Sequence, residues 1–417
     1  MRFLHISDLH LGKVIHGVSM IENGDQPHWV DRFLELAAET RPDAVLIAGD
    51  VYDRSTPSDA AAALCDRLVT GLAVDLGIEV MMIAGNHDSR EKLAFAREAL
   101  ARQRIHVAGR VEREITHVTL EDVHGPVTFW LLPYAFPAAI ARVLGDPSIR
   151  DYETAIRRLL AEQDIDMAGR NVIVAHQNVT AFGKEAERGG SESFVGTVGQ
   201  VDFGAFDGFD YVALGHIHSS YPVGRDTVRY AGTPMCYHFR ETRQPHKGPL
   251  LVELGAKGEP VDIEMREIAP LHPMREARGT AEELRESELA NVRGGEYLRL
   301  VVTDEPLTPE LCDFFRGLAD RRGSVLMERV SEFRRFTDAD ASPDSSATRE
   351  RTTEELFADF YGARYAGESP SDEDAELVHE VAEAIRADDG SRGRAATTED
   401  MARRLLDAML RQEGEGR

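Results

Sequence analysis

The sequence predicts an α/β protein whose large first domain has buried strands alternating with helices. Smaller units are predicted to follow this domain. Five short apolar runs are each bounded by turn residues and are separated by stretches with helical periodicity. Each run is continuously apolar, which is typical of strands that are covered on both faces. The length of 417 residues exceeds what one ordinary core organises, so we expect one large domain with additions.

The five apolar runs supply the main strands of a first domain, residues 1–270. They are RFLHISD, DAVLIAGD, EVMMIAGNHD, NVIVAHQN and YVALGHIH. Between the first two runs, Trp29, Phe33 and Leu36 share one face of a predicted helix. Between the second and third, Ser58 is placed to cap another helix. The segments TVRYAGTP and GPLLVELG are predicted strands that close the domain.

A small α+β module is predicted over residues 271–336. The segment EYLRLVVTD alternates like a half-buried strand, and SVLMERV has the composition of a second strand. Between them, PELCDFFRGLADRRG has the pattern of an amphipathic helix. Residues 337–351 are polar and poor in apolar side chains, which predicts a flexible linker.

The last predicted region, residues 352–411, consists of three short helices with apolar stripes. Helices this short do not bury their stripes alone, so we expect the region to pack on another surface. One hypothesis is that it binds a partner protein. The alternative is that it packs back on its own catalytic domain. The candidate partner-binding residues are Leu377, Val381, Ile385, Leu405 and Met409.

The composition predicts a cytoplasmic protein with reduced thiols. No apolar run approaches the roughly 20 residues of a membrane span, and the first residues MRFLHISDLH lack the features of a signal peptide. Cys65, Cys236 and Cys312 are scattered and form no CxxC pair, which argues against a thiolate zinc site. We expect all three to be packing residues.

The formal net charge of -25 is unusual for a protein that binds DNA unaided, because such proteins commonly present a basic surface. Part of the excess is local, since residues 338–417 hold 21 acidic and 10 basic side chains. Bound divalent cations or a basic partner would offset the charge where phosphate binds.

Metal-binding side chains follow the five apolar runs. In open α/β sheets, ligands bind in the crevice outside the carboxyl ends of the strands, so these residues are expected to converge. DxH and HxH pairs place two ligands on the same side of an extended segment. The predicted metal ligands are Asp8, His10, Asp50, Asn86, His176, His216 and His218, with His87 beside them.

The donor types favour two first-row divalent ions. Imidazole and carboxylate without cysteine favour manganese or iron over structural zinc. Two ions roughly 3.5–4 Å apart need a shared carboxylate, and Asp50 is the candidate bridge. Gly49, Gly85 and Gly215 would let the backbone approach the site closely. Each motif alone has an ordinary structural explanation, but five in order on successive strand ends predict a joint site.

DLH, GDVYD, GNHDS, the histidine of AHQN and GHIH resemble the five motifs of the calcineurin-like metallophosphoesterase superfamily. The resemblance is specific over about the first 270 residues and includes HISDLHLGK and RYAGTP. It implies a four-layer sandwich of two mixed sheets flanked by helices. It also implies that residues 271–336 form a DNA-facing cap domain and that residues 352–411 bind an ATPase subunit.

The resemblance assigns roles to the site residues. It implies one ion held by Asp8, His10, Asp50 and His218, and a second held by Asp50, Asn86, His176 and His216. It makes His87 the unligated catalytic histidine. Asp53 stands where archaeal and eukaryotic relatives have a second catalytic histidine. The bacterial branch has an aspartate there, so we expect a structural role for Asp53.

Other residues are weaker candidates. Asp88 either orients His87 or a ligand histidine, or caps the helix predicted over residues 90–101. His5 is expected to be a core neighbour of Asp8. The candidate nucleic-acid contacts are His16, Arg90, Arg316, Arg321, Arg322, Arg334 and Arg335, although a charge run is usually a solvated surface.

Three functions remain open. The resemblance implies a Mn²⁺-dependent DNA nuclease, with 3'-5' exonuclease activity on duplexes and endonuclease activity on single strands and hairpins. It would act in DNA end processing and repair as a homodimer within a heterotetramer that includes an ATPase. The alternatives are a phosphodiesterase or phosphatase for small molecules or phosphoproteins, favoured by the acidic charge, and a subunit that tethers DNA ends with little cleavage.

Overall fold

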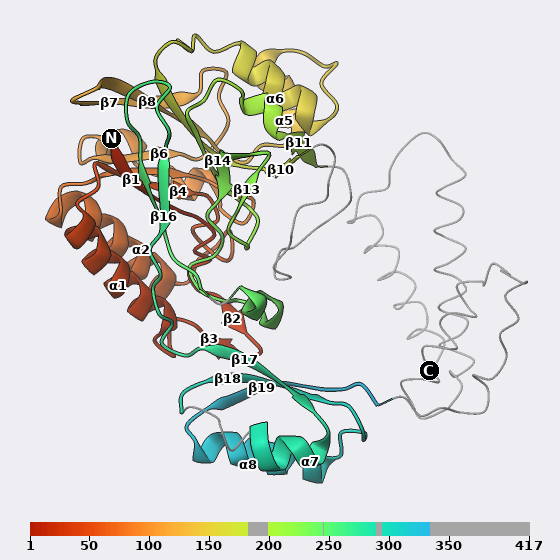
Figure 1. The fold of residues 1–417 in the computed structure, drawn as a ribbon. Helices are drawn as coiled ribbons and strands as arrows, with labels where there is room; N and C mark the ends of the chain where they lie inside the picture. Colours follow the sequence, from red (N-terminus) through yellow and green to blue (C-terminus); the bar gives the residue numbers. More distant parts are fainter. Residues whose placement is uncertain (182–198, 245, 289–293, 334–417) are drawn as a thin grey trace, which may run out of the picture. The chain divides into compact units, whose positions relative to one another are not determined.

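The computed structural model describes residues 1–181, 199–244, 246–288 and 294–333. The predicted linker, the predicted helices of residues 352–411 and their candidate partner-binding residues lie outside these ranges, as do Arg334 and Arg335. Within them, two six-stranded sheets pack face to face, and helices cover both outer faces (Figure 1). The predicted α/β architecture of two mixed sheets flanked by helices is confirmed.

The first sheet has the strand order β16-β15-β1-β4-β5-β6. Strands β1, β4, β5 and β6 are parallel, whereas β15 and β16 are antiparallel additions at one edge. The strands are β1 (Arg2–Ile6), β4 (Ala44–Ala48), β5 (Glu79–Ile83), β6 (Ile105–Ala108), β15 (Leu250–Glu253) and β16 (Asp262–Met265).

The second sheet has the order β13-β14-β12-β9-β8-β7 and is also mixed. Its strands are β7 (Thr116–Asp122), β8 (Gly125–Leu132), β9 (Arg170–His176), β12 (Tyr211–Gly215), β13 (Tyr221–Val223) and β14 (Arg225–Tyr230). Two-stranded additions lie beside the sheets: β2 (Val14–Ile15) with β3 (Val18–Ser19), and β10 (Asn178–Thr180) with β11 (Gln200–Asp202).

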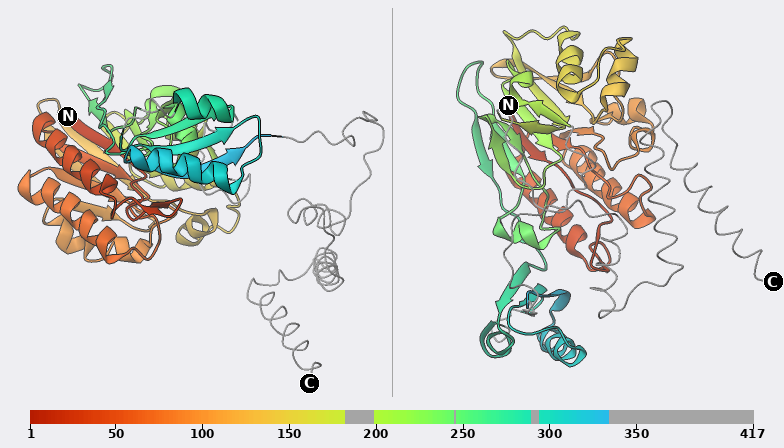
Figure 2. Two further views of the ribbon diagram at one scale, coloured as in Figure 1. Left: turned by 90° about the horizontal axis from the view of Figure 1, so that it is seen from below. Right: turned by 90° about the vertical axis from the view of Figure 1, so that its right-hand side faces the viewer.

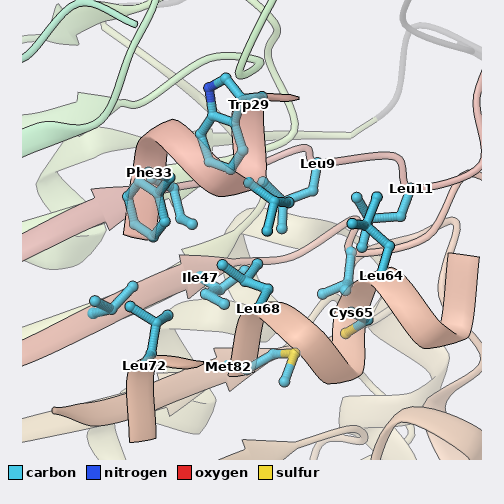
Figure 3. Close-up of a cluster of buried hydrophobic side chains, with 14 of the residues drawn as sticks. Leu9, Leu11, Trp29, Phe33, Ile47, Leu64, Cys65, Leu68, Leu72 and Met82 are labelled. Atoms are coloured by element: carbon cyan, nitrogen blue, oxygen red, sulfur yellow. The ribbon is translucent and has the colours of Figure 1, made fainter. Parts of the chain in front are cut away.

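Helices α1 (Asp25–Thr40) and α2 (Asp59–Thr70) cover the outer face of the first sheet. Their apolar side chains pack on Ile47 and Met82, and Cys65 lies buried among them as a packing residue (Figure 3). Ser58 caps α2 as predicted, because its hydroxyl accepts from the Ala61 N–H. The helix continues as a π-helical turn, Gly71–Asp75. The three cysteines are free thiols.

Helices α5 (Pro137–Leu144) and α6 (Tyr152–Ala161) cover the outer face of the second sheet. The layer between the sheets is built from alternate residues of both, such as Leu46 and Ile83 facing Phe129 and Val174. Successive residues of such a strand point alternately into the layer between the sheets and into the layer under the helices. Both layers are apolar, which explains why these runs contain so few polar residues.

The helix predicted over residues 90–101 is interrupted. It forms two short pieces, α3 (Arg90–Leu93) and α4 (Arg97–Ala101), separated at Ala96, which has a positive φ. Short 3-10 turns occur at η2 (Phe203–Phe206) and η3 (Phe239–Arg243).

A third, parallel sheet consists of β17 (Met274–Gly279), β18 (Tyr297–Val302) and β19 (Val325–Ser331), and we call the part of the chain that it organises the cap. Helices α7 (Ala281–Glu283) and α8 (Pro309–Arg321), with the π-turn η4 (Leu284–Glu288), cover one face of this sheet. The other face contacts the first domain through Tyr297 and Met327, so the helices lie on the far side (Figures 1 and 2). Among the described helices, none has the length and apolar character needed to cross a membrane.

Candidate metal centre

The residues that follow several strands, at one edge of the two sheets, have strained backbone conformations. Asp8, His10, Asp50 and His216 all have positive φ values, between 43° and 98°. Residues other than glycine rarely adopt positive φ values. Those that do are concentrated at functional sites, where the surrounding structure holds them in this conformation. All four are predicted metal ligands, so the backbone itself marks this edge as a candidate site.

One group of side chains meets around His10. Its Nε2 lies 3.2 Å from Nε2 of His218 and 3.8 Å from Oδ2 of Asp50. Nε2 of His218 is in turn 4.0 Å from Oδ1 of Asp8. Ligand atoms of Asp8, His10 and His218 are close enough to bind a single ion. We call Asp8, His10, His218 and Asp50 the first ligand group.

A second group meets around Asn86. Its Oδ1 lies 3.1 Å from Nε2 of His176 and 3.0 Å from Nδ1 of His216. Oδ2 of Asp50 lies 3.3 Å from Nε2 of His176, so this carboxylate borders both groups. We call Asp50, Asn86, His176 and His216 the second ligand group. The structure thus brings the seven predicted ligands into the two predicted sets, with Asp50 between them.

The two groups differ in burial and contain strongly interacting charges. Asp8, His10 and His218 are buried, whereas Asn86 is exposed and His216 half-buried. Burial raises the pKa of Asp8 and lowers the pKa of His10 well below its ordinary value. Although burial disfavours the charged imidazolium, the Asp50 carboxylate raises the pKa of His176 to about 9.

The donor set fits divalent metal ions. Nε2 of His10 and Nε2 of His218 face each other at 3.2 Å beside two buried carboxylates, so four potential ligand groups crowd one place. His10 also has a buried Nδ1 without a hydrogen-bond partner. A cation at this place could accept lone pairs from both Nε2 atoms and would offset the negative charge of the carboxylates.

Three glycines permit this close packing. A Cβ atom on Gly49 would lie 2.3 Å from Nδ1 of His176, and one on Gly85 would lie 2.1 Å from Oδ1 of Asp50. At Gly215 the added atom would lie 1.9 Å from the carbonyl oxygen of Ala48. Any larger residue at these positions would displace a predicted ligand or its support, as the sequence indicated.

His87 lies beside the first ligand group and is half-buried. Its Nδ1 donates to the carbonyl oxygen of Asp53 at 2.9 Å, which leaves Nε2 available. The Asp53 carboxylate binds the ammonium of Lys13 at 2.8 Å and lies 3.6 Å from Nδ1 of His10. Ligand atoms of His10, Asp53 and His87 also lie close enough together to bind an ion, which is the competing arrangement.

The structure corrects the expectation for Asp88. Its carboxylate accepts three backbone N–H groups, from Val51, Tyr52 and Gly85, and so ties together the loops after β4 and β5. It neither orients His87 nor caps a helix, because Ser89 caps α3. Burial raises the pKa of Asp88 to about 6, with a smaller contribution from Asp50. Backbone donors are invisible in a sequence, so this role could not be predicted.

A buried ion pair that the sequence analysis missed supports His218. The ammonium of Lys247 donates to the His218 carbonyl at 2.8 Å, to the Thr233 hydroxyl at 2.6 Å and to Glu241 at 2.9 Å. The Glu241 carboxylate lies 3.8 Å from Nδ1 of His218. The sequence did not single out this pair, because the segment around it is polar and contains further charges at Arg240 and Arg243.

Gln26, at the start of α1, supports His10 in a similar way. Its amide nitrogen donates to the carbonyl oxygens of Leu9 and His10, and its oxygen accepts from the Gly12 N–H. The neighbouring Asp25 carboxylate is bonded to His272 and Tyr297 of the cap. The first turn of α1 therefore links the cap to the loop that carries His10.

The candidate nucleic-acid contacts fall into two classes. Arg90 lies at the first position of α3, three residues after His87, and His16 is exposed with Nε2 3.9 Å from Glu328 of the cap. Arg316, Arg321 and Arg322 are exposed on or just after α8, on the cap face that points away from the first domain. The structure does not bring these three to the metal centre.

His5 is fully buried between the sheets and is no part of either ligand group. Its Nδ1 lies 3.0 Å from the Tyr211 hydroxyl and its Nε2 lies 3.2 Å from the Leu214 carbonyl. Because a carbonyl only accepts, Nε2 carries the proton and Nδ1 accepts from Tyr211. Burial accordingly lowers the pKa of His5 to about 3.

Comparisons with known proteins agree with this geometry. The family described as calcineurin-like phosphoesterase matches residues 1–220. The SbcD subunit of the nuclease SbcCD from Staphylococcus saprophyticus subsp. saprophyticus is 30% identical over 306 residues, which cover 72% of this chain and 77% of that protein. The protein of the same name from Staphylococcus epidermidis is 30% identical over 278 residues, covering 66% and 71%.

Proposed function

Because the chain belongs to the calcineurin-like phosphoesterase family and is a metal-dependent phosphodiesterase of the SbcCD nuclease type, we propose that it cuts DNA with two Mn²⁺ ions. The observation that carries the proposal is the convergence of seven candidate ligands into two groups that share Asp50. Imidazole, carboxylate and amide donors without cysteine favour manganese or iron.

In the proposed site, the first ligand group holds one ion and the second ligand group holds the other. Two ions so placed would activate a water and neutralise the charge on the phosphate oxygens. The strained backbone at Asp8, His10, Asp50 and His216 keeps the ligands in position before the substrate arrives.

His87 is the proposed general acid. The Asp53 carbonyl fixes a proton on Nδ1, so Nε2 is the atom that faces the substrate. A proton on Nε2 can pass to the departing sugar oxygen, and the positive ring stabilises the phosphate charge that develops during cleavage. His87 is half-buried, so part of this residue is accessible.

The relatives are named as subunits of a nuclease called SbcCD, and the finer proposals follow from that name. We propose that this chain acts with an SbcC-like ATPase in DNA end processing and repair. The proposed activities are 3'-5' exonuclease on duplexes and endonuclease on single strands and hairpins, as a homodimer within a heterotetramer. A basic partner would supply the DNA-binding surface that a chain of net charge -25 lacks.

The test is cleavage of a labelled linear duplex and a labelled hairpin by the purified chain with added Mn²⁺. His87→Ala serves as the comparison variant, and methyl p-nitrophenyl phosphate serves as a small phosphodiester. We expect the chain to cut DNA and the variant to lose this activity while it retains metal. Turnover of the small ester alone would replace the proposal with a small-molecule phosphodiesterase, which the acidic charge favours.

A further inference from the structure

Aromatic side chains and one arginine extend outward from the second ligand group. The ring of Tyr134 lies 6.2 Å from that of His216, nearly parallel to it at 23°. Phe136 contacts Tyr134 edge to face with ring centroids 5.1 Å apart, and the Arg90 guanidinium lies 5.7 Å from the centre of the Phe136 ring. We call Tyr134, Phe136, Tyr152 and Arg90 the aromatic shelf.

The shelf is mounted on the elements that carry the metal ligands. The Tyr134 N–H donates to the carbonyl oxygen of Ala84, at the end of the strand that precedes Asn86. The Tyr134 hydroxyl lies 3.1 Å from that of Tyr152 on α6, and Phe136 is the N-cap residue of α5. The rings are therefore fixed relative to the centre, and binding to them costs little ordering of side chains.

The outer part of the shelf is open to solvent. Phe136 is 49% exposed, although it lies between the half-buried Tyr134 and Arg90. A single exposed aromatic side chain would need no explanation. Here Phe136 contacts Tyr134, and the ring of Tyr134 in turn lies against that of the predicted ligand His216. The Arg90 guanidinium over the Phe136 ring has no carboxylate partner among the described residues.

Resting on the proposed function, we propose that the aromatic shelf binds an unstacked nucleobase beside the phosphate to be cut. Phe136 stacks on the base, and Arg90 contacts the adjoining backbone phosphate. Every base has a π-face, so stacking tolerates any sequence, as a nuclease for DNA ends requires. Stacking is also nearly independent of net charge, so it suits a chain this acidic.

The experiment compares Phe136→Ala and Phe136→Tyr with the unmodified full chain in Mn²⁺. The substrates are a single-stranded oligonucleotide and methyl p-nitrophenyl phosphate, which has no base. Loss of one stacked base corresponds to a roughly 5- to 150-fold weaker interaction. In Phe136→Ala we expect the ratio of DNA cleavage to ester hydrolysis to decrease by a factor in this range, because the KM for DNA rises. In Phe136→Tyr we expect the ratio to return to that of the unmodified chain.

A spectroscopic measurement reports the stacking directly. An oligonucleotide with 2-aminopurine near the 3' end loses fluorescence when that base stacks on an aromatic ring. We expect the unmodified chain to quench this fluorescence and Phe136→Ala to quench it less. Equal quenching by the two proteins would overturn the proposal.

Phe314 provides a matched control. It is 43% exposed and lies 5.6 Å from the Arg285 guanidinium, but it belongs to the outer helix α8 of the cap. We expect Phe314→Ala to leave the ratio and the quenching unchanged. If Phe136→Ala behaves like Phe314→Ala while the unmodified chain cuts DNA, only the shelf proposal fails. If the unmodified chain hydrolyses the ester but not DNA, the proposed function fails and the shelf proposal with it.

Discussion

The layer between the two sheets and the carboxyl ends of the same strands differ in how well buried histidines are hydrogen-bonded. Between the sheets, the buried His5 has a partner on each ring nitrogen. A few residues later in the sequence, His10 faces another imidazole nitrogen at 3.2 Å and has an unpaired Nδ1. The protein alone therefore satisfies both ring nitrogens of His5, whereas the ring of His10 keeps an unpaired nitrogen among the candidate metal ligands.

The backbone shows the same difference. The strands run in ordinary extended conformation, but Asp8, His10, Asp50 and His216 at their ends have positive φ values. Strain and crowded charge at the edge lower the stability of the metal-free protein, and the well-packed interior compensates for this. Substitutions at the edge should therefore change metal binding and activity, and substitutions in the interior should change stability.

The largest effect is expected from Asp50→Asn, which removes the carboxylate shared by both ligand groups. The loss of several kcal/mol of transition-state stabilisation corresponds to roughly a 10³-fold lower rate of phosphodiester hydrolysis. Calorimetric titration with Mn²⁺ should show fewer sites or weaker binding at both. Two sites of unchanged affinity would show that Asp50 does not bridge.

His87→Asn tests an edge residue that is proposed to act on the substrate and not on the metals. Loss of a general acid lowers kcat by roughly 10²- to 10⁴-fold. The Mn²⁺ titration should stay unchanged, because the His87 ring is bonded to the Asp53 carbonyl and belongs to neither ligand group. A lost metal site would instead favour the arrangement in which His10, Asp53 and His87 bind an ion.

Lys247→Met tests the buried ion pair that supports His218. Removing the ammonium breaks the buried ion pair between Lys247 and Glu241 and releases the His218 carbonyl. We expect roughly 10- to 100-fold weaker Mn²⁺ binding. The free energy of unfolding, measured with urea, should fall by about 3–5 kcal/mol, as when a buried ion pair is broken.

Lys257→Met is the matched control for Lys247→Met. Lys257 binds Asp210 at 3.0 Å, but at the surface, and Asp210 directly precedes β12, so it lies at the opposite end of that strand from His216. Its loss should change the unfolding free energy by about 0–1 kcal/mol and leave the titration unchanged. If both lysine variants bind Mn²⁺ equally well, the buried pair does not position His218.

The sequence predicted much of the fold because the buried strands are continuously apolar. It indicated the seven candidate ligands because five motifs follow these strands, whereas their division into two sets came from the resemblance to the superfamily. The hairpin of β7 and β8 was missed, since β7 alternates between half-buried and exposed residues and resembles a surface segment. The break between α3 and α4 at Ala96 was missed because alanine favours helices.

The supporting contacts of the site were the least predictable. Asp88 binds backbone N–H groups of two loops, and Glu241 pairs with Lys247 across a turn; both depend on tertiary positions that no local spacing reports. Phe136 and Tyr134 had no motif to mark them. Sequence patterns indicate which residues touch a metal, but the residues that hold those ligands in place come from packing.

The smallest effect on activity is expected from His5→Gln, the interior counterpart of the ligand substitutions. Burial lowers the pKa of His5 to about 3, while an unfolded histidine titrates near 6.5. As the pH falls from about 6.5 to about 3, the unfolded chain takes up a proton that the folded protein does not, so stability falls by up to ~1.4 kcal/mol per pH unit. Urea unfolding of the metal-free protein in chelator, at a series of pH values, should show this slope in the unmodified chain and a shallower slope in His5→Gln. Mn²⁺ binding at neutral pH should be the same in both, because His5 touches no ligand; weaker binding would mean that interior and edge are not separate regions.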